Sequence, residues 1–266
     1  MRVYETLRTG SAGAEVRLLQ RSLPAWAWAV PFSATEIDGR FGARTEAAVK
    51  FFQGEHGLEQ DGIAGETTCS LLGIWTDVIL GVDVSVYQGA INWPAVSGIN
   101  FAYLKATEGT TFKDSTYLAN YQGARARGLL VGAYHFARGS ATPHEELDHC
   151  LSVVTGPLDL PLALDVEGQF ALTGEAGLAW VLSWLEEAER RTSRRPIIYT
   201  SSRIVREKLG SGKGLEQYPV WYPRWDGQPK NVLPWQDWSI WQYSSTGVVP
   251  GIPNPVDLDR LAVSDF

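Results

Sequence analysis

The spacing of apolar positions divides the chain into two parts. In the first part, through about residue 74, apolar residues recur at the spacing of an amphipathic helix, as in Val16, Leu19 and Leu23. Ser and Thr are residue types that cap helices. Ser11 precedes this helical stretch, and Thr45 stands at the start of a second one. The pattern predicts a small all-α domain over residues 1–75.

After residue 75 the pattern changes to short apolar runs that alternate with amphipathic stretches. The runs predict eight strands, at residues 81–87, 101–107, 129–136, 160–166, 196–200, 219–222, 239–243 and 256–261. The stretches predict helices at residues 116–127, 143–154, 175–191 and 202–209. Alternation of this kind predicts an α/β fold with parallel strands, a (β/α) barrel over residues 76–266. Because little or no helix follows the last strands, we expect an irregular barrel whose closing third is partly antiparallel.

The first part contains an internal repeat. The pattern D-G-x-x-G-x-x-T occurs twice, beginning at Asp38 and at Asp61. Its glycines permit the positive φ angles of a tight turn, and its threonine is suited to the start of a helix. The repeat predicts one turn-plus-helix unit that is used twice.

Composition and charge exclude some classes of function. The 266 residues are 44% hydrophobic and 20% charged, as in ordinary globular proteins. Seven basic residues stand against nine acidic ones through Gly73, and 16 against 21 after it, so neither part has the basic surface that nucleic acids require. The N-terminal residues do not form the apolar run of a secretion signal or a membrane helix. We therefore expect a chain made in the cytoplasm, with no nucleic-acid or membrane partner and an oligomeric state that the sequence does not indicate.

Aromatic residues are frequent, with 11 tryptophans among them. Six of these fall after residue 183: Trp184, Trp221, Trp225, Trp235, Trp238 and Trp241. Flat aromatic faces fit both a protein core and the apolar faces of sugar rings.

Two acidic residues end one of the predicted strands. Asp165 and Glu167 follow an apolar run and precede Gly168, and the alternation of a strand turns both to the same side while Val166 points away. Two neighbouring carboxyls repel, so one of them keeps its proton near neutral pH, as a general acid for glycosidic bond cleavage requires. The alternative is an exposed or salt-bridged loop pair. Active sites of such barrels lie at the carboxyl ends of the strands, which favours the catalytic interpretation.

Two further acids are flanked by apolar residues. Asp83 lies within the first predicted strand and Asp257 within the last. Taken alone, each fits a buried structural acid as well as a member of the site. Asp259, two residues after Asp257, offers a second acid at the same end of the chain.

The sequence gives little support for metal or cofactor chemistry. His144 and His149 are five residues apart, which rotates the second side chain by about 140° on a helix and keeps the two from one ion. We expect no metal and no cofactor. Cys69 and Cys150 are too few for a disulfide framework and are expected to be buried thiols.

The first part resembles the three-helix peptidoglycan-binding domain of cell-wall hydrolases. The resemblance rests on residues 37–42, 45–53, 57–58 and 61–63. The segment 24–32 departs from it, because it is longer and more aromatic than the usual turn, and it could contact wall polymer or pack on the helices. The resemblance implies peptidoglycan as a partner.

The second part resembles glycoside hydrolase family 25, the muramidases. The matching segments are 83–89, 103–109, 132–138, 164–167, 197–200, 241–244 and 256–258. The resemblance implies that Asp83, Asp165, Glu167 and Asp257 form the acidic cluster. For the last position, Asp259 is an alternative to Asp257. It also implies hydrolysis of the β-1,4 bond between N-acetylmuramic acid and N-acetylglucosamine, with Glu167 as the acid.

Two mechanisms stay open at this point. A carboxylate acts directly, or the substrate's 2-acetamido group attacks while Asp165 stabilises it, which gives a retaining enzyme and is the version we favour. Candidates to line the glycan groove are Tyr87, Lys105, Tyr134, Tyr199, Trp221 and Tyr243.

The resemblance also indicates a phage-type endolysin, made in the host cytoplasm and released onto the wall. The alternatives are a bacterial autolysin of the same activity, a chitinase-like glycosidase, and a wall-binding protein without catalysis.

Overall fold

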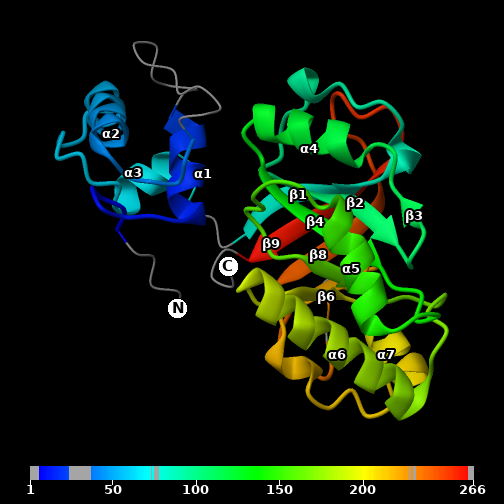
Figure 1. Ribbon diagram of the computed structural model, residues 1–266. Coiled ribbons are helices and arrows are strands. Elements are labelled where there is room, and N and C mark those ends of the chain that lie inside the picture. The colour runs from blue at the N-terminus through cyan, green and yellow to red at the C-terminus, as the bar shows by residue number, and fades with distance from the viewer. Residues whose placement is uncertain are drawn as a thin grey trace.

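The computed structural model describes residues 6–23, 37–72, 74, 78–227, 229 and 232–262. The aromatic segment 24–32 and the expected boundary between residues 75 and 76 lie outside the described residues. Figure 1 shows a group of helices beside a larger barrel.

Within its described residues the first part contains three α-helices, as its resemblance to a three-helix domain implies. They are α1 (Ala14–Ser22), α2 (Ala43–Glu55) and α3 (Glu66–Leu71). Their shared core includes the residues that suggested helical periodicity, namely Val16, Leu19, Leu23, Val49 and Phe52, together with Cys69. The two predicted caps are wrong, because Gly13 and Gly42 hold the N-cap positions of α1 and α2 and neither helix has a side-chain cap.

Each copy of the repeat is bound by one buried glutamine from the helix that precedes it. Gln53 Nε2 donates to Asp61 Oδ1 at 2.7 Å and to Thr68 Oγ1 at 3.2 Å, and its Oε1 accepts from the N–H of Gly62. Gln20 makes the same set of bonds to Asp38, Gly39 and Thr45. The threonine of the repeat is therefore a partner of the glutamine inside the helix rather than its cap.

We expect Gln53→Leu to destabilise the helical part by about 3 kcal/mol, since buried groups left without a partner cost about 1–3 kcal/mol each. The measurement is chemical unfolding of the full chain. Gln60→Leu is the matched control, because Gln60 is exposed and surface changes usually stay within about 0.5 kcal/mol. Equal stability of the two variants would contradict a structural role for the repeat.

The second part is a closed barrel of eight strands. They are β1 (Val78–Val84), β2 (Phe101–Glu108), β4 (Leu130–Phe136), β5 (Ala163–Asp165), β6 (Ile197–Tyr199), β7 (Val220–Pro223), β8 (Ile240–Gly247) and β9 (Val256–Ala262). Their order is β1-β9-β8-β7-β6-β5-β4-β2, and β1 closes the ring by pairing with β2. A short strand, β3 (Phe112–Lys113), extends β2 as a hairpin. The pairs are parallel except that β9 runs antiparallel to both β1 and β8, which confirms the expected irregular closure.

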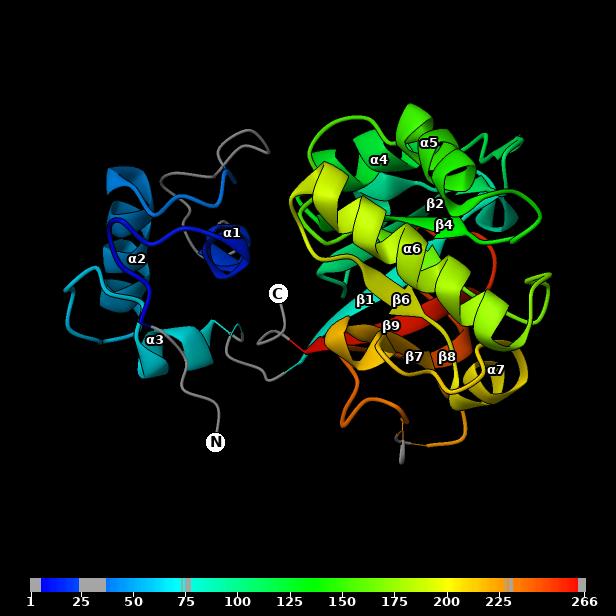
Figure 2. The same cartoon turned by 60° about the horizontal axis from the view of Figure 1, so that its bottom comes forward.

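Four helices cover the outside of the barrel. They are α4 (Tyr117–Ala126), α5 (Pro143–Val153), α6 (Gly174–Thr192) and α7 (Ser202–Lys208), each within two residues of the predicted bounds. Figure 2 shows α4, α5 and α6 lying on one side of the strands. Three short 3₁₀ helices complete this part: η2 (Val86–Gln88), η3 (Trp93–Ala95) and η4 (Leu215–Gln217). None of the helices that the structure describes is long and apolar enough to cross a membrane.

Two strand predictions need correction. The strand predicted at 81–87 ends at Val84, because the Ser85 side chain accepts from the N–H of Tyr87 while Gln88 Oε1 accepts from the N–H of Ser85, and this capping arrangement starts η2. The strand predicted at 160–166 is only Ala163–Asp165. The apolar residues on either side of it are buried without pairing as strand.

Helix α1 lies against the amino-terminal end of the barrel. Leu18 is buried in one cluster with Ile79 and Leu130, which stand near the starts of β1 and β4. Arg17 Nε pairs with Asp159 Oδ1 at 3.1 Å, and Arg21 donates to the carbonyl of Asn100. The opposite end, where the parallel strands finish, is therefore the end that a substrate can approach.

Candidate active site

All four predicted acids meet in one cavity at the carboxyl end of the barrel. Asp83 is the penultimate residue of β1, Asp165 is the last residue of β5, and Glu167 follows it by two. Because β9 is antiparallel, its second residue, Asp257, lies at the same end and is the register partner of Asp83. The four line a cavity of about 290 Å³.

The sequence around Asp165 explains how two acids reach one cavity. The short strand β5 pairs on both sides, with His135 and Phe136 of β4 and with Ile198 and Tyr199 of β6. Val166 is fully buried on the other side, held by a hydrogen bond from its N–H to the carbonyl of Tyr199. Asp165 and Glu167 consequently turn inward together, as strand alternation predicts.

Burial is the main cause that raises the pKa values of these two carboxyls. It raises the pKa of Asp165 well above its usual range, and the charge of Glu167 adds to the effect. Burial also raises the pKa of Glu167, whereas the nearby Lys105 ammonium lowers the pKa of both groups. We predicted mutual repulsion as the cause, but removal from water is the larger one.

The same cause acts on the other two acids. Burial, followed by the carboxyls of Asp259 and Asp257, raises the pKa of Asp83 well above its ordinary value. Burial, with a smaller contribution from Glu167, raises the pKa of Asp257 to about 6. The cavity therefore carries fewer negative charges near neutral pH than four free carboxylates would.

Lys105 is part of an ion-pair network at the rim. Its Nζ lies 2.7 Å from Glu108 Oε2 and 4.8 Å from the ring centre of Phe136. Glu108 in turn accepts from Arg138 Nε at 2.8 Å. These contacts fix the ammonium group beside the acid pair, although the side chain remains among those that line the cavity.

Gln242 is a site residue that the sequence reasoning missed. Its Nε2 donates to Asp83 Oδ2 at 2.8 Å, and its Oε1 accepts from Tyr199 Oη at 3.1 Å and from Trp225 Nε1 at 3.2 Å. A buried amide inside an apolar strand was the available signal, since alternation turns Gln242 to the opposite face from Trp241 and Tyr243.

The predicted groove residues separate into three groups. Tyr134, Tyr199 and Trp221 form the cavity floor, where the Trp221 side chain is only 2% exposed and meets the rings of both tyrosines edge to face. Tyr87 stands at the rim, 81% exposed. Tyr243 lies outside the cavity and packs against Trp241 and Arg260.

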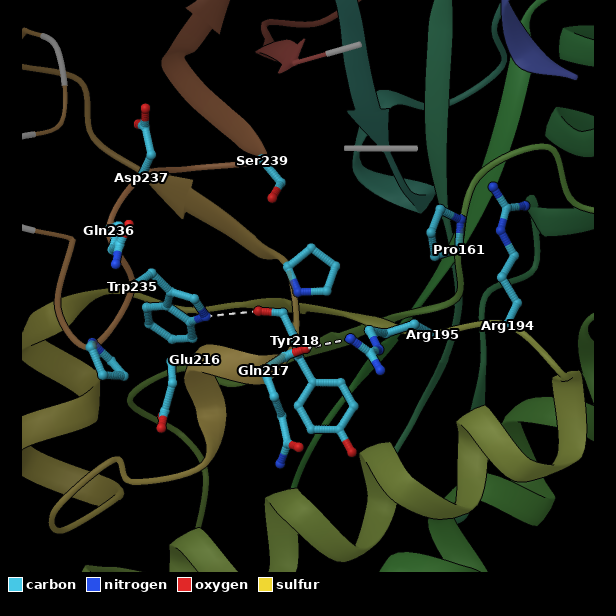
Figure 3. A pocket seen from close by; sticks show the side chains of 12 residues that line it. Pro161, Arg194, Arg195, Glu216, Gln217, Tyr218, Trp235, Gln236, Asp237 and Ser239 are labelled. Atoms are coloured by element: carbon cyan, nitrogen blue, oxygen red, sulfur yellow. Dashed lines mark hydrogen bonds between the residues drawn. The ribbon is translucent and has the colours of Figure 1, made fainter. Parts of the chain in front are cut away.

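A larger cavity, of about 740 Å³, lies at the opposite end of the barrel. Its lining comes from residues just before β5, β6, β7 and β8, among them Pro161, Arg195, Tyr218 and Ser239. Figure 3 shows Trp235 bonded to a backbone carbonyl of Tyr218 and Arg195 bonded to that of Gln217. The acids whose pKa values are raised by burial are at the other end, so we place the chemistry in the smaller cavity.

The two histidines of α5 turn to different partners. His144 Nε2 lies 3.4 Å from Asp148, and His149 Nε2 lies 3.0 Å from the carbonyl of Phe112. Within the described residues, no group of three or more His, Cys, Asp or Glu side chains is arranged to hold a metal ion. Cys69 and Cys150 are buried free thiols, as predicted.

Comparisons with known proteins match both parts of the chain. Residues 82–252 match the family described as glycosyl hydrolases family 25, and residues 12–72 match the putative peptidoglycan binding domain. Both resemblances drawn from the sequence are thereby confirmed.

Individual relatives agree with these matches. Lysozyme M1 of Streptomyces globisporus is 35% identical over 202 residues, which cover 70% of this chain and 68% of that protein. N,O-diacetylmuramidase of Arthroderma benhamiae is 31% identical over 182 residues, covering 63% and 77%. The crystal structure of a bacterial lysozyme from Streptomyces coelicolor superimposes with a TM-score of 0.65 at 34% identity, over 69% of this chain and 91% of that one.

Proposed function

Because this chain belongs to family 25 of the glycosyl hydrolases, we propose that it hydrolyses the β-1,4 bond between N-acetylmuramic acid and N-acetylglucosamine in peptidoglycan. The observation that carries the proposal is the cluster of Asp83, Asp165, Glu167 and Asp257 in one cavity. Burial raises the pKa of Asp165 and of Glu167, which favours the protonated acid that a glycosidic leaving group needs.

Glu167 is the general acid of this proposal. It is half-buried, it lines the cavity, and its pKa is raised by burial. Its proton passes to the glycosidic oxygen as the bond to the sugar's anomeric carbon breaks. The ionised Glu167 then takes a proton from the attacking water, so that the enzyme returns to its starting state.

Asp165 supports attack by the 2-acetamido group of the substrate. The Oδ1 atom of Asp165 is buried and accepts no hydrogen bond from any residue that the structure describes. An acetamido N–H placed there would donate to it while the acetamido oxygen bonds to the anomeric carbon. Water then opens the cyclic ion from the other side, and the configuration at the anomeric carbon is retained. Asp83 and Asp257 adjust the charge and position this water.

The N-terminal part contributes by tethering. The match to a peptidoglycan-binding domain supports a role in holding the barrel on the wall, which raises the local concentration of substrate without adding catalytic contacts. The two relatives described above, whose names are those of a lysozyme and a muramidase, support the same substrate.

Product analysis tests the proposed bond. We expect mass spectrometry of digested peptidoglycan to find muropeptides that end in reducing N-acetylmuramic acid. Reducing N-acetylglucosamine would overturn muramidase action, free stem peptides would indicate an amidase, and intact glycan with bound protein would indicate a wall-binding protein only. Cleavage of chitin at a comparable rate would favour the chitinase-like alternative.

The origin as a phage endolysin is a narrower prediction, with a bacterial autolysin as its alternative. An endolysin held in the cytoplasm is expected to leave its host intact until the membrane is permeabilised. The measurement is culture turbidity of an expressing host before and after a permeabilising agent is added. Lysis without that agent would contradict the cytoplasmic location.

A further inference from the structure

Asp259 is a fifth acid beside the site, and it is enclosed. It lies two residues after Asp257 on β9, where its register partners are Gly81 of β1 and Gln242 of β8. Alternation turns both acids inward, but Asp257 lines the cavity while Asp259 has no exposed surface. A carboxyl at such a position needs hydrogen-bond donors, because burial of an unpaired charge is costly.

Only one oxygen of Asp259 has a donor among the described residues. Oδ1 accepts from Trp221 Nε1 at 2.8 Å. Oδ2 is buried and receives no hydrogen bond from the part of the chain that the structure describes. An unmatched buried acceptor of this kind calls for a proton or a donor.

The group within hydrogen-bonding range is the carboxyl of Asp83. Asp83 already accepts from Gln242 Nε2 on its Oδ2 atom. Two ionised carboxylates are both acceptors and repel each other, whereas a single proton between them makes one a donor and satisfies the other.

We propose that Asp83 and Asp259 share one proton, and that Asp259 is thereby the positioning residue that holds the Asp83 carboxyl in the cavity. The second half of this statement rests on the proposed function, since it concerns the reaction in which Asp83 takes part. The first half does not depend on any activity.

The surroundings of the pair agree with a retained proton. Burial is the largest cause that raises the pKa of Asp259, to about 8, and the charge of Asp257 on the same strand adds to it. Three phenols lie near the pair: Tyr103 of β2, Tyr134 of β4 and Tyr199 of β6. The pKa of each phenol is raised by burial, so these groups stay neutral. Asp165, Glu167 and the Lys105 ammonium line the same cavity as Asp83.

The first experiment detects the shared proton by measuring how the unfolding constant depends on pH. In the native state the pair keeps a proton that free aspartic acids, with a pKa of about 3.9, release above about pH 4. Stability from this source is therefore present at low pH and is lost as pH rises toward about 8. Asp259→Asn supplies a permanent N–H donor to Asp83 and removes the need for the proton.

We expect the unfolding constant of the wild type, divided by that of Asp259→Asn, to rise about tenfold per pH unit between pH 5 and pH 7. In Asp83→Asn the new amide donates to Asp259, so the ratio of unfolding constants for this variant should rise with the same slope. Asp148→Asn is the control with no slope in this range, because Asp148 is exposed and Arg191 lowers its pKa. A ratio that stays constant with pH for both Asp259→Asn and Asp83→Asn would overturn the shared proton.

The second experiment separates positioning from simple packing. We expect Asp259→Leu, of similar size, to lower kcat at least about tenfold with KM changed less than about twofold, while Asp259→Asn keeps kcat within about fivefold of the wild type. Thermal unfolding confirms that both variants are folded. If both folded variants lose kcat equally, or neither does, Asp259 does not position Asp83. If the unfolding slopes are as expected but the wild type cleaves another bond, only the proposed function fails.

Discussion

We expect Glu167→Gln to lower kcat on purified peptidoglycan at least about a hundredfold, which is the usual scale for loss of a general acid. The amide has nearly the same shape as the carboxylic acid but has no proton to give to the leaving oxygen. Because burial raises the pKa of Glu167, the native enzyme keeps that proton to a higher pH than a free glutamic acid does and loses it as pH rises further. The measurement is release of reducing sugar over a range of pH, and the variant should lose the fall in rate at alkaline pH.

Glu186→Gln is the matched control for this change. Glu186 is exposed on α6, on the outside of the barrel, and its replacement should leave kcat within about twofold. A folded Glu167→Gln variant with near-native kcat would remove Glu167 from its role. The remaining candidate for the acid would then be Asp257, whose pKa burial raises to about 6.

The barrel was predictable because its strands have buried apolar runs of the right length. The eight runs and four helices were found, and so was the antiparallel closure, where β8 and β9 are joined without a helix. The predictions that failed concern the residues at which some strands end. Ser85 and Gln88 turn the chain into η2 at the end of β1, and this local hydrogen bonding overrides the apolar pattern of Val86 and Tyr87.

The acids of the site were predictable for a similar reason. Two acids at positions i and i+2 of a strand share a face, which brought Asp165 and Glu167 into the cavity. The same rule could not separate Asp257 from Asp259, because both turn inward. Depth along the barrel separates them: Asp257 is at the open end, and Asp259 lies one pleat deeper beneath Trp221. Depth depends on register between strands, and a single sequence does not specify register.

Aromatic residues were harder to assign than acids. Trp221 and Tyr243 both lie in late strands, and both are residue types that fit stacking on a sugar ring. Trp221 is enclosed by Tyr103, Tyr134 and Tyr199, so it supports the floor of the cavity instead of presenting an open face. Trp225, which follows β7 and is 59% exposed, has the open face that Trp221 lacks.

Asp165→Asn is the second change for which we expect a large effect, a loss of about a hundredfold to a thousandfold in kcat. The amide side chain would keep an oxygen that accepts the acetamido N–H, but it has no proton to release and so cannot take on the negative charge that stabilises the positive cyclic ion as it forms. Losses of this size are typical when one stabilising group of a transition state is removed. The measurement is kcat on purified peptidoglycan, with thermal unfolding to show that the variant is folded.

The same variant separates the two mechanisms when the substrate is changed as well. If the acetamido group attacks, a wall whose glycans have lost their N-acetyl groups should be a poor substrate for the wild type, and Asp165→Asn should lose little more on that wall. The two changes then remove one interaction, and their free-energy costs are not additive. If a carboxylate acts directly, the N-acetyl group is only a binding contact, and the two losses should multiply. Multiplication of the losses would therefore overturn acetamido participation while leaving Glu167 as the acid, because both mechanisms require the leaving oxygen to be protonated.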